Sequence, residues 1–422
     1  MDYDFATLDF SDDSQAERAR VSAWLGAVQR GFHSGRPSDD HEKHWLTHVE
    51  ADGVVCTGAW LPDGEFGAGP APVATFAYFD KTLNAGLDLV PLRMITDVTT
   101  SPTHRRRGLV RRLMEASLDD AVAQGIPVAA LTASEATIYG RWGFGVATFA
   151  QKIEVETGPR FSLRDFKDPG RVELIDPLES WSIVKGVFDT FHTTCRGSVD
   201  WPQFYELLHT GAYDFNQGGP DTKLRGAVHL DADGVVDGFA LYRPDGEDND
   251  RRKLKVTEMA ALTTAAGLAL WDFLAHVDLT NHVSYALARP DDPLRWALTD
   301  INVVSHTASS EFLWVRVLDV ERALAARPWV ADGRVVIEVD DEQSHAAGRF
   351  VVETRDGRAS ITRTEEAGEV RMHAEALGSL YLGGAHAATL ADAGRLTGTP
   401  AALATFARMA DLAKAPYNVT GF

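Results

Sequence analysis

The sequence of 422 residues predicts an α/β plus α+β fold, in which two α/β units are followed by a smaller α+β unit. Three observations support this prediction. At about 150 residues per domain, the length predicts two or three domains. Strand-like and helix-like patterns alternate before and after a polar stretch at 157–172, and the last hundred residues combine short strands with short helices. The expected domains are residues 1–156, 157–305 and 306–422.

The first unit is expected to open with a helix at 17–32. Three strands then follow, each rich in Val, Ala, Thr or aromatic residues, at Val54–Trp60, Pro72–Phe79 and Leu92–Thr100. The last of these ends at Ser101 and Pro102, because proline cannot continue a strand ladder.

From Gly108 onward the pattern becomes helical. Apolar and small residues recur at the spacing of one helical face, at Val110, Leu113, Met114, Ser117, Leu118 and Ala121. Gly125 ends this helix, and a strand is expected at Pro127–Thr132. Ser134 then caps a short helix that runs through Tyr139. The order is that of an α/β unit with a crossover helix.

The remaining two units are predicted from the same signals. The second unit is expected to contain helices at Trp181–Thr190, Pro202–His209 and Thr264–His276, and strands at Leu224–Leu230, Gly234–Arg243 and Lys253–Leu262. The third is expected to contain strands at Leu313–Leu318, Arg334–Val339, Gly348–Thr354 and Arg358–Thr364, and helices at Asp319–Ala326, Ala374–Leu380, His386–Ala393 and Pro400–Met409. The second order resembles the first, which suggests an internal duplication.

Composition excludes several classes of function. The net charge of −20 repels phosphate backbones and anionic lipids, so neither a nucleic-acid nor a membrane role is expected, and cationic small molecules are favoured as partners. Cys56 and Cys195 are too few for a disulfide scaffold or a cysteine-rich zinc site. The acidic N-terminus does not have the pattern of a signal peptide, so a cytoplasmic location is expected. His41, His44 and His48 could share one helical face, where we expect a surface position and no metal.

The segment with the strongest chemical signal is the basic turn between the strand at Leu92–Thr100 and the following helix. Arg105, Arg106 and Arg107 precede Gly108, whose missing side chain permits close approach of the backbone. Such a turn points backbone N–H groups and the positive helix end at one small volume, which suits a pyrophosphate. Taken alone, the turn fits an ordinary basic loop equally well.

The context of this turn resembles the acyl-CoA-binding core of the GNAT acetyltransferases. An Arg-x-x-Gly turn follows a strand, and a later strand leads into a short helix and the run from Tyr139 to Phe144, YGRWGF. In that family the turn binds the CoA pyrophosphate and the preceding strand splays at a bulge.

Nearly the whole chain is similar to the enhanced-intracellular-survival (Eis) family of N-acetyltransferases. The matching stretches are SPTHRRRGL (101–109), ASEATIYGRWGFG (133–145), DPLRWALTD (292–300), LWVRVLDVERAL (313–324), LGSLYLGG (377–384) and the terminal Phe422. The resemblance implies two GNAT-like domains, of which the first binds acetyl-CoA, and a third domain like the sterol carrier proteins. It also implies a homohexamer built from two trimers, and acetylation of amines such as those of aminoglycosides, at one or several positions, or of lysine-like side chains.

The resemblance also implies roles for individual residues. Tyr139 would act as the acid, and the terminal carboxylate of Phe422 as the base. The donor would be held by Val98, Thr99, Thr100, Arg105, Arg106, Arg107, Gly108, Leu109, Val110 and Ser134, with a backbone N–H of Val98 or Thr100 polarising the thioester carbonyl. Phe32 and Trp45 would line the acceptor pocket.

Each of these assignments has a structural alternative. Tyr139 could be a core tyrosine, Ser134 a helix cap alone, Phe32 and Trp45 core residues of helices, and Phe422 a frayed end. At the level of function, the alternative is a lipid- or ligand-binding protein that uses the carrier-like domain and keeps a vestigial acetyltransferase core.

Overall fold

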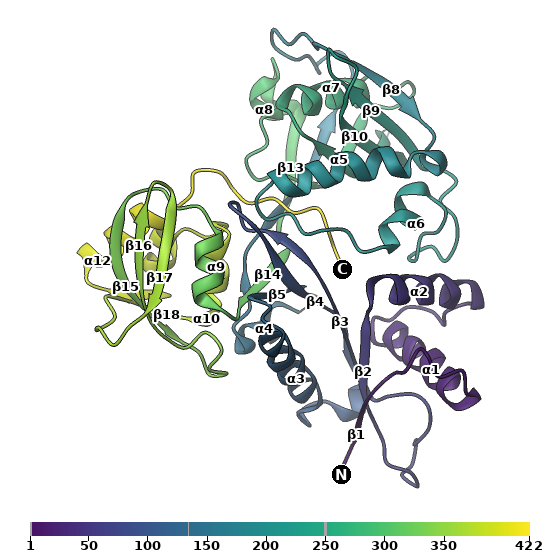
Figure 1. Cartoon of the computed structure of the whole chain (residues 1–422). Helices are drawn as coiled ribbons and strands as arrows, with labels where there is room; N and C mark the ends of the chain where they lie inside the picture. Colours follow the sequence, from purple (N-terminus) through teal and green to yellow (C-terminus); the bar gives the residue numbers. More distant parts are fainter. Residues whose placement is uncertain (1, 134, 249–250) are drawn as a thin grey trace.

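The structure is a computed structural model that describes residues 2–133, 135–248 and 251–422. Figure 1 shows three bodies in chain order, with the C-terminus between the first two. The predicted α/β plus α+β architecture is confirmed. No helix within the described ranges is long and apolar enough to cross a membrane.

The first body is built on a seven-stranded sheet of order β1-β2-β3-β4-β5-β14-β6. Its strands are β1 (Asp4–Thr7), β2 (Val55–Trp60), β3 (Ala74–Asn84), β4 (Leu89–Thr100), β5 (Val128–Thr132), β6 (Gly145–Val146) and β14 (Leu313–Val317). Helices α1 (Gln15–Gly31) and α2 (Asp39–Asp52) cover one face, and α3 (Leu109–Ala123) covers the other. The short α4 (Ala136–Tyr139) follows β5.

The crossover helix has the predicted apolar face. Leu113, Met114, Ser117, Leu118 and Ala121 are buried, as is Leu109, and Val110 is half-buried. These side chains pack on the sheet residues Phe76, Ile95 and Leu131.

Helix α2 corrects one expectation. His41, His44 and His48 do lie on this helix, but His41 is buried and His48 is largely covered. Their rings pack against the second body: His41 meets Phe215 at 5.3 Å between ring centroids, and His48 meets Phe204 at 5.0 Å. The contact between the two domains therefore buries histidines that were expected at the surface.

The second body repeats this plan with a sheet of order β13-β7-β12-β11-β10-β9-β8. Its strands are β7 (Phe149–Glu156), β8 (Arg171–Ile175), β9 (Arg225–Leu230), β10 (Val236–Asp248), β11 (Arg251–Ala261), β12 (His282–Ala288) and β13 (Val304–Glu311). Helices α5 (Trp181–Thr194) and α6 (Phe204–Thr210) pack on one face, and α7 (Thr264–Ala275) packs on the other, beside the short α8 (Leu294–Ala297).

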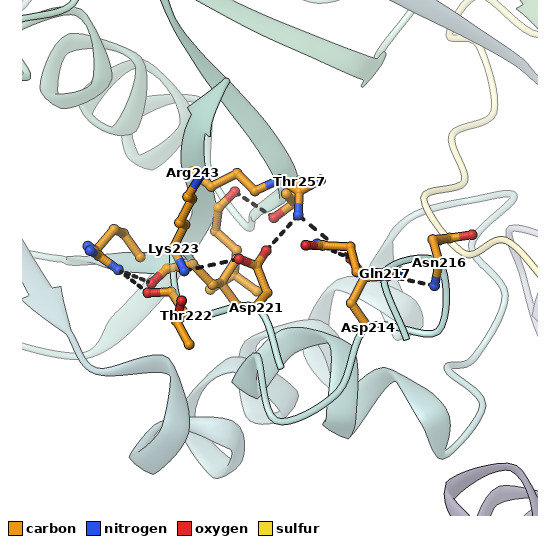
Figure 2. A network of polar contacts seen from close by, with 11 residues as sticks. Asp214, Asn216, Gln217, Asp221, Thr222, Lys223, Arg243 and Thr257 are labelled. Atoms are coloured by element: carbon orange, nitrogen blue, oxygen red, sulfur yellow. Dashed lines mark hydrogen bonds and ion pairs between the residues drawn. The ribbon is translucent and has the colours of Figure 1, made fainter. Parts of the chain in front are cut away.

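A polar network fixes the loop that follows α6 (Figure 2). Arg243 of β10 bonds Asp221 at 2.6 Å and lies 3.6 Å from Asp214. The Asp214 carboxylate in turn accepts from the backbone of Asn216 and from the side chain of Gln217. This loop carries Phe215, which packs on Phe204 of α6. The network therefore ties α6 to the second sheet.

The two sheets exchange strands, which corrects the predicted domain boundaries. Strand β7, placed by the sequence in the first domain, pairs with β12 and β13 of the second sheet. Strand β14, placed by the sequence in the third domain, lies between β5 and β6 of the first sheet. Boundaries after residues 156 and 305 therefore separate each of these strands from its own sheet. No strand was predicted at residues 149–156, and for the predicted strand at Leu313–Leu318 propensity does not identify the partner strand.

The third body holds a five-stranded sheet of order β17-β16-β15-β18-β19. Its elements are α9 (Val320–Ala326), β15 (Gly333–Asp340), β16 (Gly348–Arg355), β17 (Arg358–Arg363), β18 (Val370–His373), α10 (Ala374–Tyr381), α11 (Ala387–Asp392), β19 (Leu396–Gly398) and α12 (Pro400–Ala410). Helix α10 packs directly on the first sheet: a Cβ added at Gly378 would lie 2.2 Å from the carbonyl oxygen of Val315.

The chain ends in a tail, residues 411–422, that leaves the third body and runs between the other two (Figure 1). Tyr417, Asn418, Val419 and Thr420 are at most 5% exposed. An irregular segment this deeply buried must be held by specific hydrogen bonds, because its backbone has no ladder of its own.

Candidate functional site

Strands β4 and β5 separate in the middle of the first sheet. They pair in parallel from Leu92 with Val128 to Met94 with Ala130, and both continue beyond the last pair. On its other side β4 is bulged, because its register against β3 shifts by one residue. Asp97 lies in the bulge with φ of 52°, and its carbonyl accepts from the Thr75 hydroxyl at 2.7 Å. The splay and the bulge expose backbone that a regular sheet would pair.

A cavity of about 240 Å³ lies at this splay. It is lined by Phe32, Ile95, Thr96, Asp97, Val98, Leu131, Thr132, Ala133, Tyr139 and Phe422. The lining thus joins α1, both splayed strands, α4 and the last residue of the sequence.

The basic turn lies at the start of α3, directly after β4. Gly108 is the N-cap residue with φ of 77°, and no described side chain caps the helix. Arg106 also has positive φ, 61°, and all three arginines are exposed. Uncapped helical N–H groups beside three guanidinium groups fit the pyrophosphate of a CoA donor.

Tyr139 is buried at the wall of the cavity, beside Trp142 and Phe144. Burial, together with the charge of Glu135, raises the pKa of its hydroxyl above the ordinary value. The hydroxyl is therefore protonated at neutral pH and can give up a proton only to a strong base.

Phe422 reaches the cavity from the opposite end of the chain. Its terminal oxygen accepts a hydrogen bond from the Thr132 hydroxyl at 2.7 Å. Its ring packs edge-on against Phe79, with 6.4 Å between centroids. The end of the chain is thus docked on β5 and β3.

Asp97 is the second acidic group of the cavity. Burial raises the pKa of its carboxyl to about 6, and the charge of His48 opposes this in part. No hydrogen bond to this carboxylate comes from the described residues, and no Lys, Arg or His is among the side chains described as lining the cavity. Unpaired carboxylates in a partly dry space favour a cationic ligand.

The comparisons with known proteins agree with this geometry. Two GNAT acetyltransferase domain families match residues 15–147 and 199–317, and the sterol carrier protein domain matches residues 320–419. The N-acetyltransferase Eis of Mycobacterium tuberculosis is 36% identical over 365 residues, which cover 83% of this chain and 85% of that protein. The chain belongs to the Eis family of N-acetyltransferases.

Two further comparisons cover more of the chain. An uncharacterized N-acetyltransferase of Streptomyces griseus is 33% identical over 395 residues, 91% of this chain and 92% of that one. The crystal structure of Eis1 from Mycobacterium abscessus is 27% identical, with a TM-score of 0.83 and full coverage of both chains. The protein is therefore a GNAT acetyltransferase with two GNAT domains and a carrier-like domain.

Four of the fourteen residues predicted for the site line the cavity. Val98, Tyr139 and Phe422 line one cavity, and Phe32, 48% exposed, lines it as well. Trp45 does not line it: this side chain is buried in α2 and stacks on Trp24, with 5.7 Å between ring centroids. Ser134 lies outside the described residues.

Three residues of the site were missed or left secondary by the sequence. Thr132 holds the terminal oxygen of Phe422, and Tyr205 of α6 holds the backbone of Gly421. Asp97 lines the cavity but was not among the residues assigned to the site. A hydroxyl at the end of a strand or on a helix gives no sequence signal for such a role, because the partner lies over 200 residues away.

Proposed function

We propose that this enzyme transfers acetyl groups from acetyl-CoA to primary amines of cationic small molecules, either aminoglycoside-like, at one or several positions, or lysine-like. The observation that carries the proposal is the cavity at the splay, where Asp97, Tyr139 and the end of the chain meet without a cationic side chain among the described lining. The net charge of −20 would further attract such acceptors.

The donor is assigned to the turn and the splayed strand. The backbone N–H groups at Gly108, Leu109 and Val110 and the three preceding arginines would bind the pyrophosphate. The backbone of Val98–Thr100 would face the arm that carries the thioester, and Ser134 stays a predicted contact of the donor. Acetyl-CoA supplies the activated acetyl group, and we propose no metal.

The chemistry requires three proton movements: one proton leaves the acceptor ammonium, one reaches the departing sulfur, and one leaves the nitrogen as the amide forms and restores the hydroxyl of Tyr139. The carboxylate of Phe422, fixed by Thr132, would take a proton from the acceptor ammonium, directly or through water, and so free the nitrogen lone pair. The nitrogen then bonds the acetyl carbon while the carbon–sulfur bond breaks. A backbone N–H of Val98 or Thr100 would stabilise charge on the carbonyl oxygen, and Tyr139 would give its proton to the departing sulfur.

We further propose a homohexamer formed from two trimers. Large exposed apolar side chains outside the first body, including Leu174, Leu279 and Trp296 at 69%, 79% and 79% exposure, would be covered by subunit contacts. Sedimentation tests this proposal, and a monomer at micromolar concentration would contradict it.

The lipid-binding alternative receives less support. Side chains fill the interior of the carrier-like domain: Ile337, Phe350 and Leu377 are each at most 1% exposed and belong to one packed core. A lipid that copurifies with the protein would revive this alternative.

The test of the proposed function is release of CoA thiol, measured with a panel of acceptors. Kanamycin, a linear diamine and a lysine-containing peptide are compared with a fully N-acetylated kanamycin as the matched control. We expect thiol release with the cationic amines alone, and mass spectrometry then counts the acetyl groups on each product. Release that is independent of every amine would contradict the proposal.

A further inference from the structure

The second GNAT-like domain has the same strand splay as the first. Strands β11 and β12 pair in parallel from Lys253 with His282 to Val256 with Tyr285, and both continue beyond that pair. A cleft of about 680 Å³ opens beside the continuing part of β11. The start of α7 forms part of its wall, at Thr263, Thr264 and Gly267.

The tail of the same chain enters this cleft. Tyr417 and Lys414 belong to the lining. The Tyr417 hydroxyl donates to the carbonyl of Leu287 at 2.6 Å, beyond the last β11–β12 pair, and lies 3.1 Å from the Tyr285 hydroxyl. The guanidinium of Arg289 lies 5.0 Å from the centre of the Tyr417 ring.

Further hydrogen bonds hold the tail on the way from Tyr417 to the active-site cavity. The backbone N–H of Tyr417 donates to Arg196, and Thr420 donates through its hydroxyl to the carbonyl of Val199 at 2.6 Å. The Asn418 side chain accepts from the N–H of Val199 at 3.2 Å. The partners in these contacts all belong to the second domain.

The last anchor before Phe422 is Tyr205 of α6. Its hydroxyl accepts from the N–H of Gly421 at 2.7 Å and donates to the Gly421 carbonyl at 3.2 Å. One buried hydroxyl therefore fixes both sides of the residue that precedes Phe422.

We propose that the second GNAT-like domain is the receptor of the C-terminal tail, with Tyr417 bound in its splay and Tyr205 acting as a positioning residue for Phe422. The gap between β11 and β12, which corresponds to the gap that would admit the acyl group in the first domain, thus holds the phenol of Tyr417. The expected loss of kcat rests on the proposed role of the Phe422 carboxylate as the base. The binding of the tail by the second domain does not depend on that role.

The experiment compares the full-length protein with three variants and a control. Y417A empties the splay, Y417F keeps the ring without its hydroxyl, and Y205F removes the contact to Gly421. Y213F is the matched control, because the Tyr213 hydroxyl is buried without a hydrogen-bond partner in the described part of the chain. Hydrogen exchange of the peptide 413–422 reports docking, and kcat, acceptor KM and acetyl-CoA affinity report function.

We expect tail exchange to accelerate strongly in Y417A, and by roughly 3- to 10-fold in Y417F and Y205F, because each loses one or two net hydrogen bonds. We expect kcat to fall in the same order, with acetyl-CoA affinity unchanged and Y213F like the wild type. Tail exchange in Y205F and Y417F as slow as in the wild type would overturn the receptor role, even if Y417A did not fold. A loosened tail with full kcat would support the receptor role and contradict the base assigned to Phe422.

Discussion

The two GNAT-like domains use one sheet design for different purposes. In each, two parallel strands pair and then separate, after Met94 in the first sheet and after Val256 in the second. In the first domain the gap opens into the cavity that holds Tyr139, while in the second it takes Tyr417 of the tail. Splayed strands of the same design therefore open on different surroundings in the two domains.

The difference lies at the start of the helix that follows the splayed strand. Helix α3 begins at Gly108, without a capping side chain among the described residues and after three arginines. Helix α7 begins at Thr263, whose hydroxyl caps the N–H of Ala266 and bonds the Asp237 carboxylate at 3.0 Å. The Thr263 hydroxyl already occupies one N–H group at the start of α7, and the nearby Asp237 carboxylate would repel a pyrophosphate. The two helix starts therefore differ in chemistry, and of the two the start of α3 fits the proposed donor.

The largest expected effect comes from Phe422, which the tail held by the second domain delivers to the cavity of the first. Deleting Phe422 leaves the tail anchors at Tyr417 and Tyr205 but removes the proposed base, so we expect acetyl transfer to fall by roughly 10³- to 10⁴-fold. Acetyl-CoA affinity, measured by calorimetry, should stay the same because the turn in the first domain is intact.

A C-terminal tag provides the companion test, because it converts the carboxylate of Phe422 into an amide. The same tag at the N-terminus is the control and should be harmless. If the C-terminally tagged protein acetylates amines at the untagged rate, another group such as Asp97 must serve as the base.

The next test removes one tyrosine hydroxyl from each domain. Acetyl transfer is assigned to the first domain, so a large effect is expected there and none in the second. Tyr139→Phe keeps the ring but removes the proposed acid, so kcat should fall by roughly 10²- to 10³-fold with acetyl-CoA affinity nearly unchanged. Tyr242→Phe, in the core of the second domain, is the control and should keep the wild-type kcat. Lost donor affinity with kcat retained would assign Tyr139 to binding instead.

The helix starts are compared by placing one carboxylate at each. Gly108→Glu puts a negative charge at α3 and forces a side chain into φ of 77°, so acetyl-CoA should bind roughly 100-fold more weakly. Thr264→Glu puts the same charge at the exposed first turn of α7 and should leave the affinity unchanged. Gly108→Ala separates backbone strain from charge. Equal calorimetric affinities for Gly108→Glu and the wild type would place the donor elsewhere.

Much of the first domain could be predicted from local patterns. The buried face of α3 and the turn at Gly108 follow from spacing and from glycine, since both depend on neighbours within a few residues. The exchange of β7 and β14 could not be predicted, because strand pairing depends on partners far away in the sequence.

The residues of the candidate site also differ in how far the sequence could identify them. Tyr139 and Phe422 came from a family resemblance, and both line the cavity. Trp45 has the helical position of a pocket residue, but helical spacing cannot distinguish a core face from a pocket face, and here the ring stacks on Trp24. Thr132 and Tyr205 hold Phe422 and Gly421, which lie 290 and 216 residues away in the sequence. A local sequence pattern gives no sign of such contacts.

The smallest expected effect concerns the acids of the two splayed strands. Asp97 of β4 faces the cavity with a pKa of about 6, whereas Glu258 of β11 is buried 3.6 Å from His209, and burial raises the pKa of its carboxyl. If Asp97 binds the acceptor ammonium, the acceptor KM should fall as the pH rises through about 6, because the carboxyl then loses its proton. Asp97→Asn should remove this dependence and raise KM at pH 8 by roughly tenfold, the value of one charge-assisted hydrogen bond.

The melting temperature of Asp97→Asn distinguishes a role of Asp97 in acceptor binding from a role in stabilising the fold. The folded state raises the pKa of Asp97 above its ordinary value near 3.8, so the folded protein holds this proton more tightly than the unfolded chain does. The contribution of Asp97 to stability is therefore greatest below about pH 4 and declines as the pH rises toward 6, and Asp97→Asn should melt at or above the wild-type temperature at pH 8. Glu258→Gln is the matched control and should keep the wild-type pH profile of KM. A KM that is independent of pH between 5 and 8 in the wild type would remove Asp97 from the acceptor site and leave the end of the chain as its one acidic contact among the described lining residues.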